Sequence, residues 1–354
     1  MVQLNKTLLI GVGVLMATST LARELSPQQK LAKQFILPLK APQPSDNIAN
    51  PAKIELGQQL FFDPRLSKDG TVSCNSCHNV MASGTDNRAV SAGVGGQLGG
   101  RGAPTVFNSA FLSVQFWDGR AATLEDQAKG PLTNPVEMAM PDNDAVIARV
   151  KQIDGYASQF EKAFGAKDSI NIDNLAKAIA SYERTLITPN SPFDLWAKGD
   201  SSAISASAQR GFQKMNEVGC TSCHSGPGFS GPTLPVGTGF YQRFPTFADS
   251  EYVKKYDLMA DQGRKNVTKD EADAHMFRVP TLRNIATTAP YFHNGNVATL
   301  QEAIRVMGKT QLNKNLANDE VNDIYNFLVT LTGSIPEQKM PRLSKTMGTT
   351  LTPQ

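Results

Sequence analysis

The sequence lacks several features that would assign it quickly to a class. Its 354 residues contain only four cysteines and four histidines, and 35 basic against 32 acidic residues leave a net charge of +3. This balance indicates neither a nucleic-acid nor a membrane-surface partner. No stretch alternates polar and apolar residues for long enough to predict a sheet. Beyond the N-terminal segment, no apolar run is long enough to cross a bilayer. We therefore expect an all-α protein with no membrane span in its mature form.

All four cysteines belong to one pattern that occurs twice, Cys74-Asn75-Ser76-Cys77-His78 and Cys220-Thr221-Ser222-Cys223-His224. This C-x-x-C-H pattern is the attachment signature of c-type haem. The two thiols add across the vinyl groups of one porphyrin, and the following histidine is the proximal iron ligand. The chain is thus predicted to carry two c-type haems, with His78 and His224 as iron ligands.

Three other uses of the cysteines deserve comparison with haem attachment. The pairs could form disulfides, build one zinc site together, or act as thioredoxin-type redox pairs. A histidine follows both pairs and the pairs lie far apart in the sequence, which disfavours zinc. No βαβ pattern surrounds either pair, which disfavours the redox alternative.

The N-terminus has the pattern of a secretory signal. Lys6 precedes an apolar run at 8–18, and small residues lead to Ala22. We expect residues 1–22 to be a signal peptide cleaved after Ala22; the alternative is an uncleaved membrane anchor. Covalent haem attachment takes place outside the bacterial cytoplasm, so both features predict a periplasmic protein.

The remaining 332 residues are enough for two domains. Each haem motif follows an expected helix, one capped by Asn50 with Pro51 at its first position, the other capped by Ser205. Each half also ends with an amphipathic helix, expected at 173–186 and 319–331, and another helix is expected at 143–164 with Asn143 as its cap.

We therefore predict two cytochrome c-like domains, each with one covalently bound haem. The first spans residues 23–190 and the second 191–335, joined near 188–192. The polar tail, 336–354, is expected either to pack on the first domain or to fray.

Several further stretches resemble one family. They are 103–108 (APTVFN), 115–120 (QFWDGR), 124–128 (LEDQA), 134–138 (NPVEM), 279–284 (VPTLRN) and 289–295 (APYFHNG). Together with the haem motifs, they resemble the bacterial di-haem cytochrome c peroxidases. The resemblance implies that the N-terminal haem reduces hydrogen peroxide and that the C-terminal haem relays electrons from a small cytochrome c or a copper protein. It also implies a homodimer and a calcium ion between the domains.

The resemblance assigns a second ligand to the second haem. The family places a methionine 14 residues after the histidine of the Y-F-H motif, here Met307 after His293. A thioether ligand raises the reduction potential, which suits a haem that accepts electrons. Core packing beside Ile304 is the alternative role for this methionine.

The resemblance also implies three residues around the first haem. Glu137 matches the catalytic glutamate, which would move a proton between the peroxide oxygens. Gln127 matches a glutamine that hydrogen-bonds the peroxide, and Trp117 matches a tryptophan between the haems. Phe116 is expected to line the pocket. Alternatively, Glu137 is a capping or surface carboxylate and Trp117 only a core residue.

The chain departs from the family at the residue that closes the peroxide site. Typical members have a histidine 16 residues after the first proximal histidine, which binds the oxidised iron until the second haem is reduced. Here that position is Val94, in the glycine-rich stretch 93–102. Valine cannot bind iron, so we expect the oxidised site to be open, or closed by a weaker ligand such as Gln97. His275 has no expected role and is predicted to lie in an exposed loop.

A second departure affects the calcium site. The family's asparagine ligand falls at Gly102, whereas the expected carbonyl ligands, Thr288 and Pro290, are present. Calcium prefers six to eight oxygens. We expect a calcium site completed by water and weaker than usual.

Two functions compete with peroxide reduction. Related di-haem enzymes oxidise tryptophan residues of a partner protein and also lack the switch histidine, but they place a tyrosine where Met307 stands. A di-haem electron carrier without catalysis would need neither Glu137 nor Gln127 near an open iron.

Overall fold

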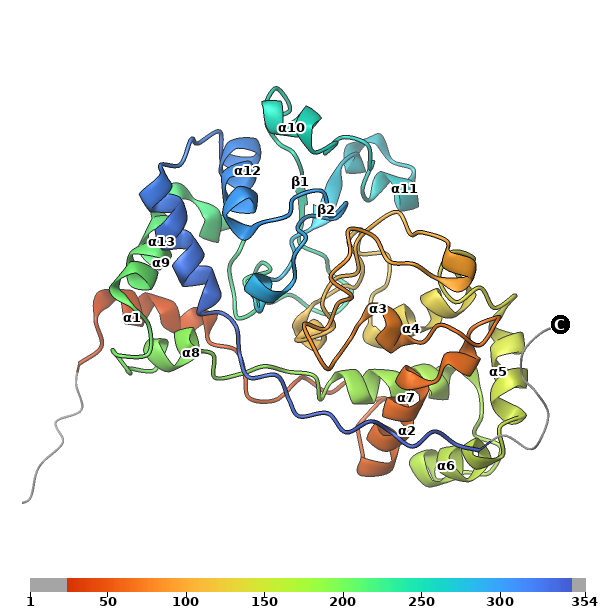
Figure 1. Cartoon of the computed structure of the whole chain (residues 1–354). Coiled ribbons are helices and arrows are strands. Elements are labelled where there is room, and N and C mark those ends of the chain that lie inside the picture. Colours follow the sequence, from red (N-terminus) through yellow and green to blue (C-terminus); the bar gives the residue numbers. More distant parts are fainter. Residues whose placement is uncertain (1–23, 346–354) are drawn as a thin grey trace, which may run out of the picture.

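The computed structural model describes residues 24–345, so the predicted signal peptide, 1–22, lies outside the described residues. Within that range the chain is mostly helical (Figure 1). The helices are α1 (Pro27–Ala32), α2 (Pro51–Phe62), α3 (Cys74–Cys77), α4 (Leu124–Thr133), α5 (Asn143–Lys151), α6 (Asp154–Phe164), α7 (Ile172–Glu183), α8 (Pro192–Ala197), α9 (Ala206–Val218), α10 (Glu251–Lys255), α11 (Lys265–Thr268), α12 (Leu300–Leu312) and α13 (Asn318–Val329). The predicted all-α class is confirmed.

The helices that lead into the two haem motifs begin where the sequence predicts. Asn50 caps α2 by accepting the Lys53 N–H at 2.8 Å, and Pro51 is the first helical residue. Ser205 caps α9 by accepting the Ala208 N–H at 3.1 Å. These caps satisfy amide groups that have no partner inside a helix.

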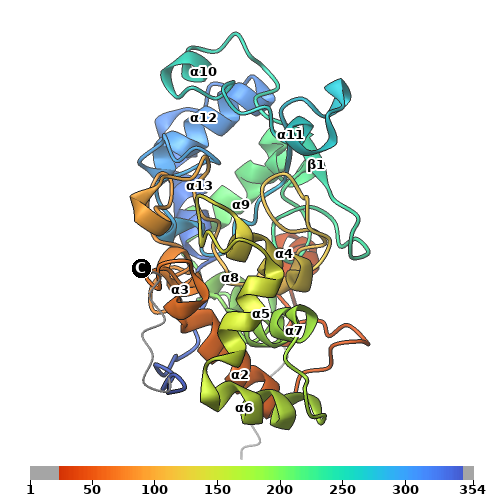
Figure 2. The same cartoon turned by 90° about the vertical axis from the view of Figure 1, so that its right-hand side faces the viewer.

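Two hydrophobic cores form from similar helix pairs. The first core gathers around α2 and α7, and the second around α9 and α13. In each pair a glycine of the first helix lies directly against the backbone of the second, Gly57 at Ala178 and Gly211 at Asp323. A side chain at either glycine would meet a carbonyl oxygen, so these glycines allow the close packing of each pair. Figure 2 shows α2 and α6 at the bottom of the molecule and α10 and α12 at the top.

The two ends of the described chain pack on the core that is distant in sequence. Phe35, just after α1, stacks on Phe229 with ring centroids 4.7 Å apart and belongs to the second core. The C-terminal segment runs back along the first core, where Gln338 accepts the Tyr182 hydroxyl at 2.7 Å (Figure 1). The tail therefore packs on the first half as far as residue 345. The boundaries at 190 and 335 stay predictions.

Two local predictions were wrong. The stretch 143–164 is two helices, because Ile153 is extended and buried between α5 and α6, and the cap of α5 is Asp142. There is also a small antiparallel sheet of β1 (Tyr241–Arg243) and β2 (Met276–Arg278). Three residues per strand are too few to show an alternating pattern.

Candidate functional site

A cavity of about 760 Å³ lies beside the first haem motif. Cys74 and Cys77 fall three residues apart on α3, and both line the cavity together with His78. The Nδ1 atom of His78 lies 3.0 Å from the Pro104 carbonyl oxygen. This bond leaves Nε2 free for a metal and orients the ring. Burial lowers the pKa of His78, so the imidazole is in its neutral, ligating form.

A second cavity, of about 190 Å³, lies beside the second motif and has a largely apolar lining. Cys220, Cys223, His224 and Met307 all line it. The Nδ1 atom of His224 lies 2.9 Å from the Phe229 carbonyl oxygen, which again leaves Nε2 free. Burial lowers the pKa of His224 as well. The arrangement at the first histidine is therefore repeated at the second.

These residues fit a covalently held haem in each cavity. Each cavity combines a cysteine pair with a neutral histidine whose Nε2 atom is free to bind iron. Burial raises the pKa of all four thiols. The two pairs line separate cavities, which excludes one zinc site built from both.

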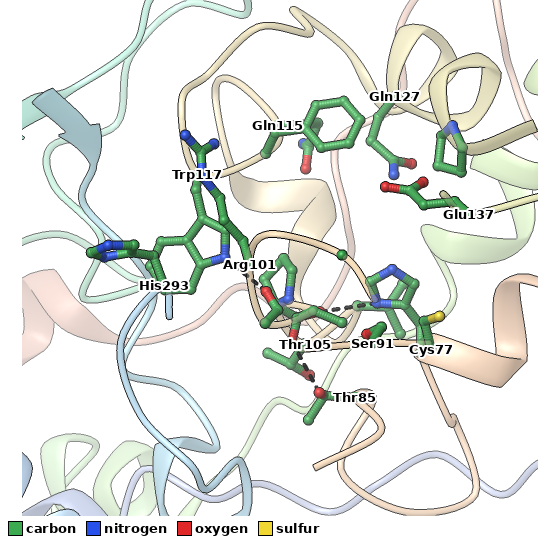
Figure 3. A pocket seen from close by; sticks show the side chains of 18 of the residues that line it. Cys77, Thr85, Ser91, Arg101, Thr105, Gln115, Trp117, Gln127, Glu137 and His293 are labelled. Carbon is green, nitrogen blue, oxygen red and sulfur yellow. Dashed lines mark hydrogen bonds between the residues drawn. The ribbon is translucent and has the colours of Figure 1, made fainter. Parts of the chain in front are cut away.

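The side chains expected to handle peroxide share the first cavity. Glu137, Gln127 and Trp117 all line it, and Figure 3 shows Glu137 and Gln127 close to one another on one side. Asn134 Nδ2 donates to the Glu137 carboxylate at 3.0 Å. Burial raises the pKa of Glu137, while the nearby Arg120 and the Asn134 bond lower it. A half-buried carboxyl with a raised pKa is suited to accepting and returning a proton.

The loop that carries Val94 packs against the backbone of Glu137. Val94 is buried in the first core, and its N–H donates to the Glu137 carbonyl at 2.9 Å. A side chain at Gly93 would collide with the carbonyls of Val136 and Glu137. Gln97 is exposed, with its amide 3.5 Å from the Pro135 carbonyl. The loop thus packs Val94 into the core and leaves Gln97 at the surface.

Trp117 lines both cavities, and so does His293, which sequence reasoning did not select. Trp117 Nε1 donates to the Gly102 carbonyl at 2.9 Å. The His293 ring stacks on Phe277 with centroids 4.4 Å apart, and Figure 3 shows it beside Trp117. Burial lowers the pKa of His293 to about 4, so the ring is neutral. These aromatic side chains occupy the region between the two haem sites.

The expected calcium ligands are backbone groups at one cavity. Thr288, Pro290 and Gly102 line the first cavity. Gly102 has no side-chain oxygen, its carbonyl already accepts from Trp117, and its N–H donates to the His293 carbonyl. Among residues 24–345, no group of three or more His, Cys, Asp or Glu side chains could hold a metal. Calcium prefers six to eight oxygens, so these backbone carbonyls would need water oxygens beside them, as the sequence predicts.

His275 is not the exposed loop residue that the sequence predicts. Its side chain is buried, and Nδ1 lies 2.9 Å from the Asp261 carbonyl. The residue adopts a positive φ of 58° directly before β2. A positive φ at a histidine cannot be read from the sequence pattern.

Two charged side chains at the cavities also escaped sequence reasoning. Arg278 lines both cavities, and burial lowers the pKa of this guanidinium to about 10. Its guanidinium donates to the backbone carbonyls of Phe116 and Val279, each at 3.1 Å. Glu183 lines the first cavity from the end of α7. Sequence reasoning missed Glu183 because a charged residue at the end of an amphipathic helix is normally expected on the side that faces solvent.

Comparison with known proteins assigns the family. Residues 51–202 match the di-haem cytochrome c peroxidase family. The cytochrome c551 peroxidases of Nitrosomonas europaea and Pseudomonas aeruginosa are 45% and 44% identical to this chain. The alignments cover 88% and 84% of this chain, and the same shares of those proteins.

The chain belongs to the di-haem cytochrome c peroxidase family. It is accordingly an oxidoreductase, and the family implies two haems. Among solved structures, it resembles a MauG-like protein associated with microbial copper homeostasis, with 29% identity and a TM-score of 0.74. That match covers 86% of this chain and 97% of the other. Among the described residues, no helix combines the length and apolarity needed to cross a membrane.

Proposed function

We propose that this protein is a periplasmic peroxidase that reduces hydrogen peroxide to water with electrons from a small cytochrome c or copper protein. One observation carries the proposal. Glu137 and Gln127 line the same cavity as Cys74, Cys77 and His78. An acid–base group and a hydrogen-bonding amide therefore lie beside the place where the first haem would be attached.

The chemistry divides between the cofactor and the chain. When bound, the first haem supplies the iron at which peroxide is reduced. The Glu137 carboxylate takes the proton from the inner peroxide oxygen and returns it to the outer one, so that water can leave. The Gln127 amide holds the peroxide in line for this transfer. The Asn134 bond and the Val94 N–H hold Glu137 in position for it.

Electrons would arrive through the second site. His224 and Met307 line the second cavity and are proposed as its two iron ligands. A methionine ligand raises the potential of a haem, which favours acceptance of an electron from a donor protein. Trp117 lines both cavities and is proposed to shorten the path between them.

The peroxide site is proposed to be open in the oxidised protein. Val94 occupies the position of the family's switch histidine, and its side chain is packed in the first core. Gln97 is exposed. Neither side chain is placed to close the site, so activation by prior reduction of the second haem would not be needed.

The proposal also includes the electron donor, the oligomeric state and the cellular location. The donor is a small cytochrome c or a copper protein, the active form is a homodimer, and the signal-like N-terminus directs the protein to the periplasm. Calcium is proposed as a weakly bound ion at the Thr288, Pro290 and Gly102 carbonyls, completed by water, with no part in the proposed chemistry.

A second candidate function is oxidation of tryptophan residues in a partner protein. The chain resembles a MauG-like protein in structure, and Val94 removes the switch histidine, as in the tryptophan-oxidising relatives. Met307 counts against this function, since those enzymes have a tyrosine there.

A steady-state assay tests the proposed function. The purified di-haem protein is mixed with peroxide and reduced cytochrome c, and oxidation of the cytochrome is followed by absorbance. Two cytochromes oxidised per peroxide consumed would support the proposal. Peroxide-dependent oxidation of tryptophan in a partner protein, without cytochrome turnover, would favour the second function.

A further inference from the structure

One oxygen of the Glu183 carboxyl group is buried at the first cavity without a hydrogen-bond partner. The residue ends α7 and is 6% exposed, and its side chain lines the cavity. Its Oε2 atom has no hydrogen-bond partner. Glu137, a half-buried carboxyl at the same cavity, accepts a bond from Asn134. An unpaired carboxylate is costly in such a place, so the group holds a proton instead.

The charges around Glu183 do not offset this cost. Arg184, the next residue, is directed to Glu125 on α4, with nitrogen–oxygen distances of 2.7 and 3.1 Å. Burial raises the pKa of Glu183 to about 8; Arg184 lowers it and Glu125 raises it. On α7 itself, the Tyr182 hydroxyl donates to Gln338 in the tail. At neutral pH the Glu183 carboxyl is therefore protonated.

Glu183 also lies close to the point of haem attachment. After burial, the charge of Glu183 is the largest cause that raises the pKa of the Cys74 thiol. A unit charge in a poorly solvated cavity interacts strongly with its neighbours. The ionisation of Glu183 and the charge on the first haem would consequently influence each other.

Peroxide reduction consumes protons as well as electrons: H2O2, two electrons and two protons give two waters. Glu137 takes one proton from the inner oxygen and returns it to the outer one, so it supplies none of the two consumed. The two protons consumed therefore enter the site from elsewhere, and a titratable group at the cavity can couple their entry to that of the electrons.

We propose that protonation of Glu183 is coupled to electron uptake at the first haem site, so that this carboxyl binds a proton from solvent when the site is reduced in mildly alkaline solution. The proposal rests on the proposed function for its place in turnover. An added electron makes the site more negative, which favours the protonated carboxyl. Where the oxidised site leaves Glu183 ionised, one electron and one proton then enter together, and the net charge of the site does not change. Glu183 would hold this proton near the haem without touching the peroxide, so it is a positioning residue and not a catalytic one.

The test is the pH dependence of the first haem's reduction potential, measured by spectroelectrochemistry between pH 6 and 10 without peroxide. In the wild-type holoprotein, the potential should fall by up to about 59 mV per pH unit around pH 8, the value for one proton bound per electron. In Glu183→Gln, which keeps the shape without the titratable group, this slope should disappear. The matched control Glu137→Gln should keep it.

Two outcomes would overturn the proposal. One is a wild-type potential that does not change over this interval, which needs no variant to establish. The other is an unchanged slope in Glu183→Gln with both haems attached. A wild-type protein that does not turn over peroxide would instead count against the proposed function. The slope of the first haem's reduction potential against pH would not depend on that result.

Discussion

The backbone N–H of Val94 donates to the carbonyl oxygen of Glu137 at 2.9 Å. The position that carries an iron ligand in typical members of the family thus supports the proposed acid–base residue in this chain. Val94 is buried in the first core, and Gly93 packs directly against the carbonyls of Val136 and Glu137. Together these two loop residues hold the backbone of Glu137. The following predictions test this arrangement and the roles around it.

Replacing Glu137 by glutamine keeps the shape and removes the titratable group. Peroxide turnover should fall by about 10²–10⁴-fold, the usual contribution of a positioned acid or base. Both haems should remain attached, as judged from the absorption spectrum. Full activity in Glu137→Gln would remove this residue from the mechanism.

Gly93→Ala tests whether the loop positions Glu137. The new methyl group would collide with the carbonyls of Val136 and Glu137 and displace them. Turnover should fall by up to about 10²-fold, as expected for a misplacement near 1 Å. Gly100→Ala is the matched control, because a methyl group there meets open space. Equal activities in the two variants would contradict the proposed support.

Met307→His tests ligation at the second site. If the thioether binds iron, its replacement by imidazole should lower that haem's potential by on the order of hundreds of millivolts, within the range that axial ligands command. A redox titration of the second haem measures this directly. An unchanged potential would show that Met307 only packs beside Ile304.

The raised pKa of Glu183 also predicts how stability depends on pH. The group has an ordinary pKa of 4.5 when unfolded and about 8 when folded. Between these values the folded protein binds more protons, so stability falls as pH rises, by at most about 1.4 kcal/mol per unit. Glu183→Gln should therefore gain melting temperature over the wild type as pH rises from 5 to 8. A constant difference across this range would contradict the raised pKa.

The sequence predicted the parts of this site that depend on local chemistry. The haem motifs occupy short helical turns that present both cysteines to one cavity, and the caps Asn50 and Ser205 begin the helices that precede them. These features follow from spacing and side-chain type. Glu137, Gln127 and Trp117 were placed by resemblance, and they do line one cavity.

The features that the sequence did not predict depend on packing between distant segments. Phe35 joins the second core because it stacks on Phe229, nearly two hundred positions away, as the numbering shows. Ile153 interrupts a helical pattern because its side chain is buried in the first core. Glu183 continues a helix whose neighbours cover it, so its burial is visible only in the folded chain.

The most direct test of the central claim is stopped-flow mixing of the fully oxidised protein with peroxide. We expect an immediate spectral change at the first haem without prior reduction, because Val94 cannot bind iron. Val94→His should create a low-spin oxidised haem and make the reaction depend on prior reduction. A wild-type protein whose oxidised first haem is low-spin and inert until reduced would contradict the account.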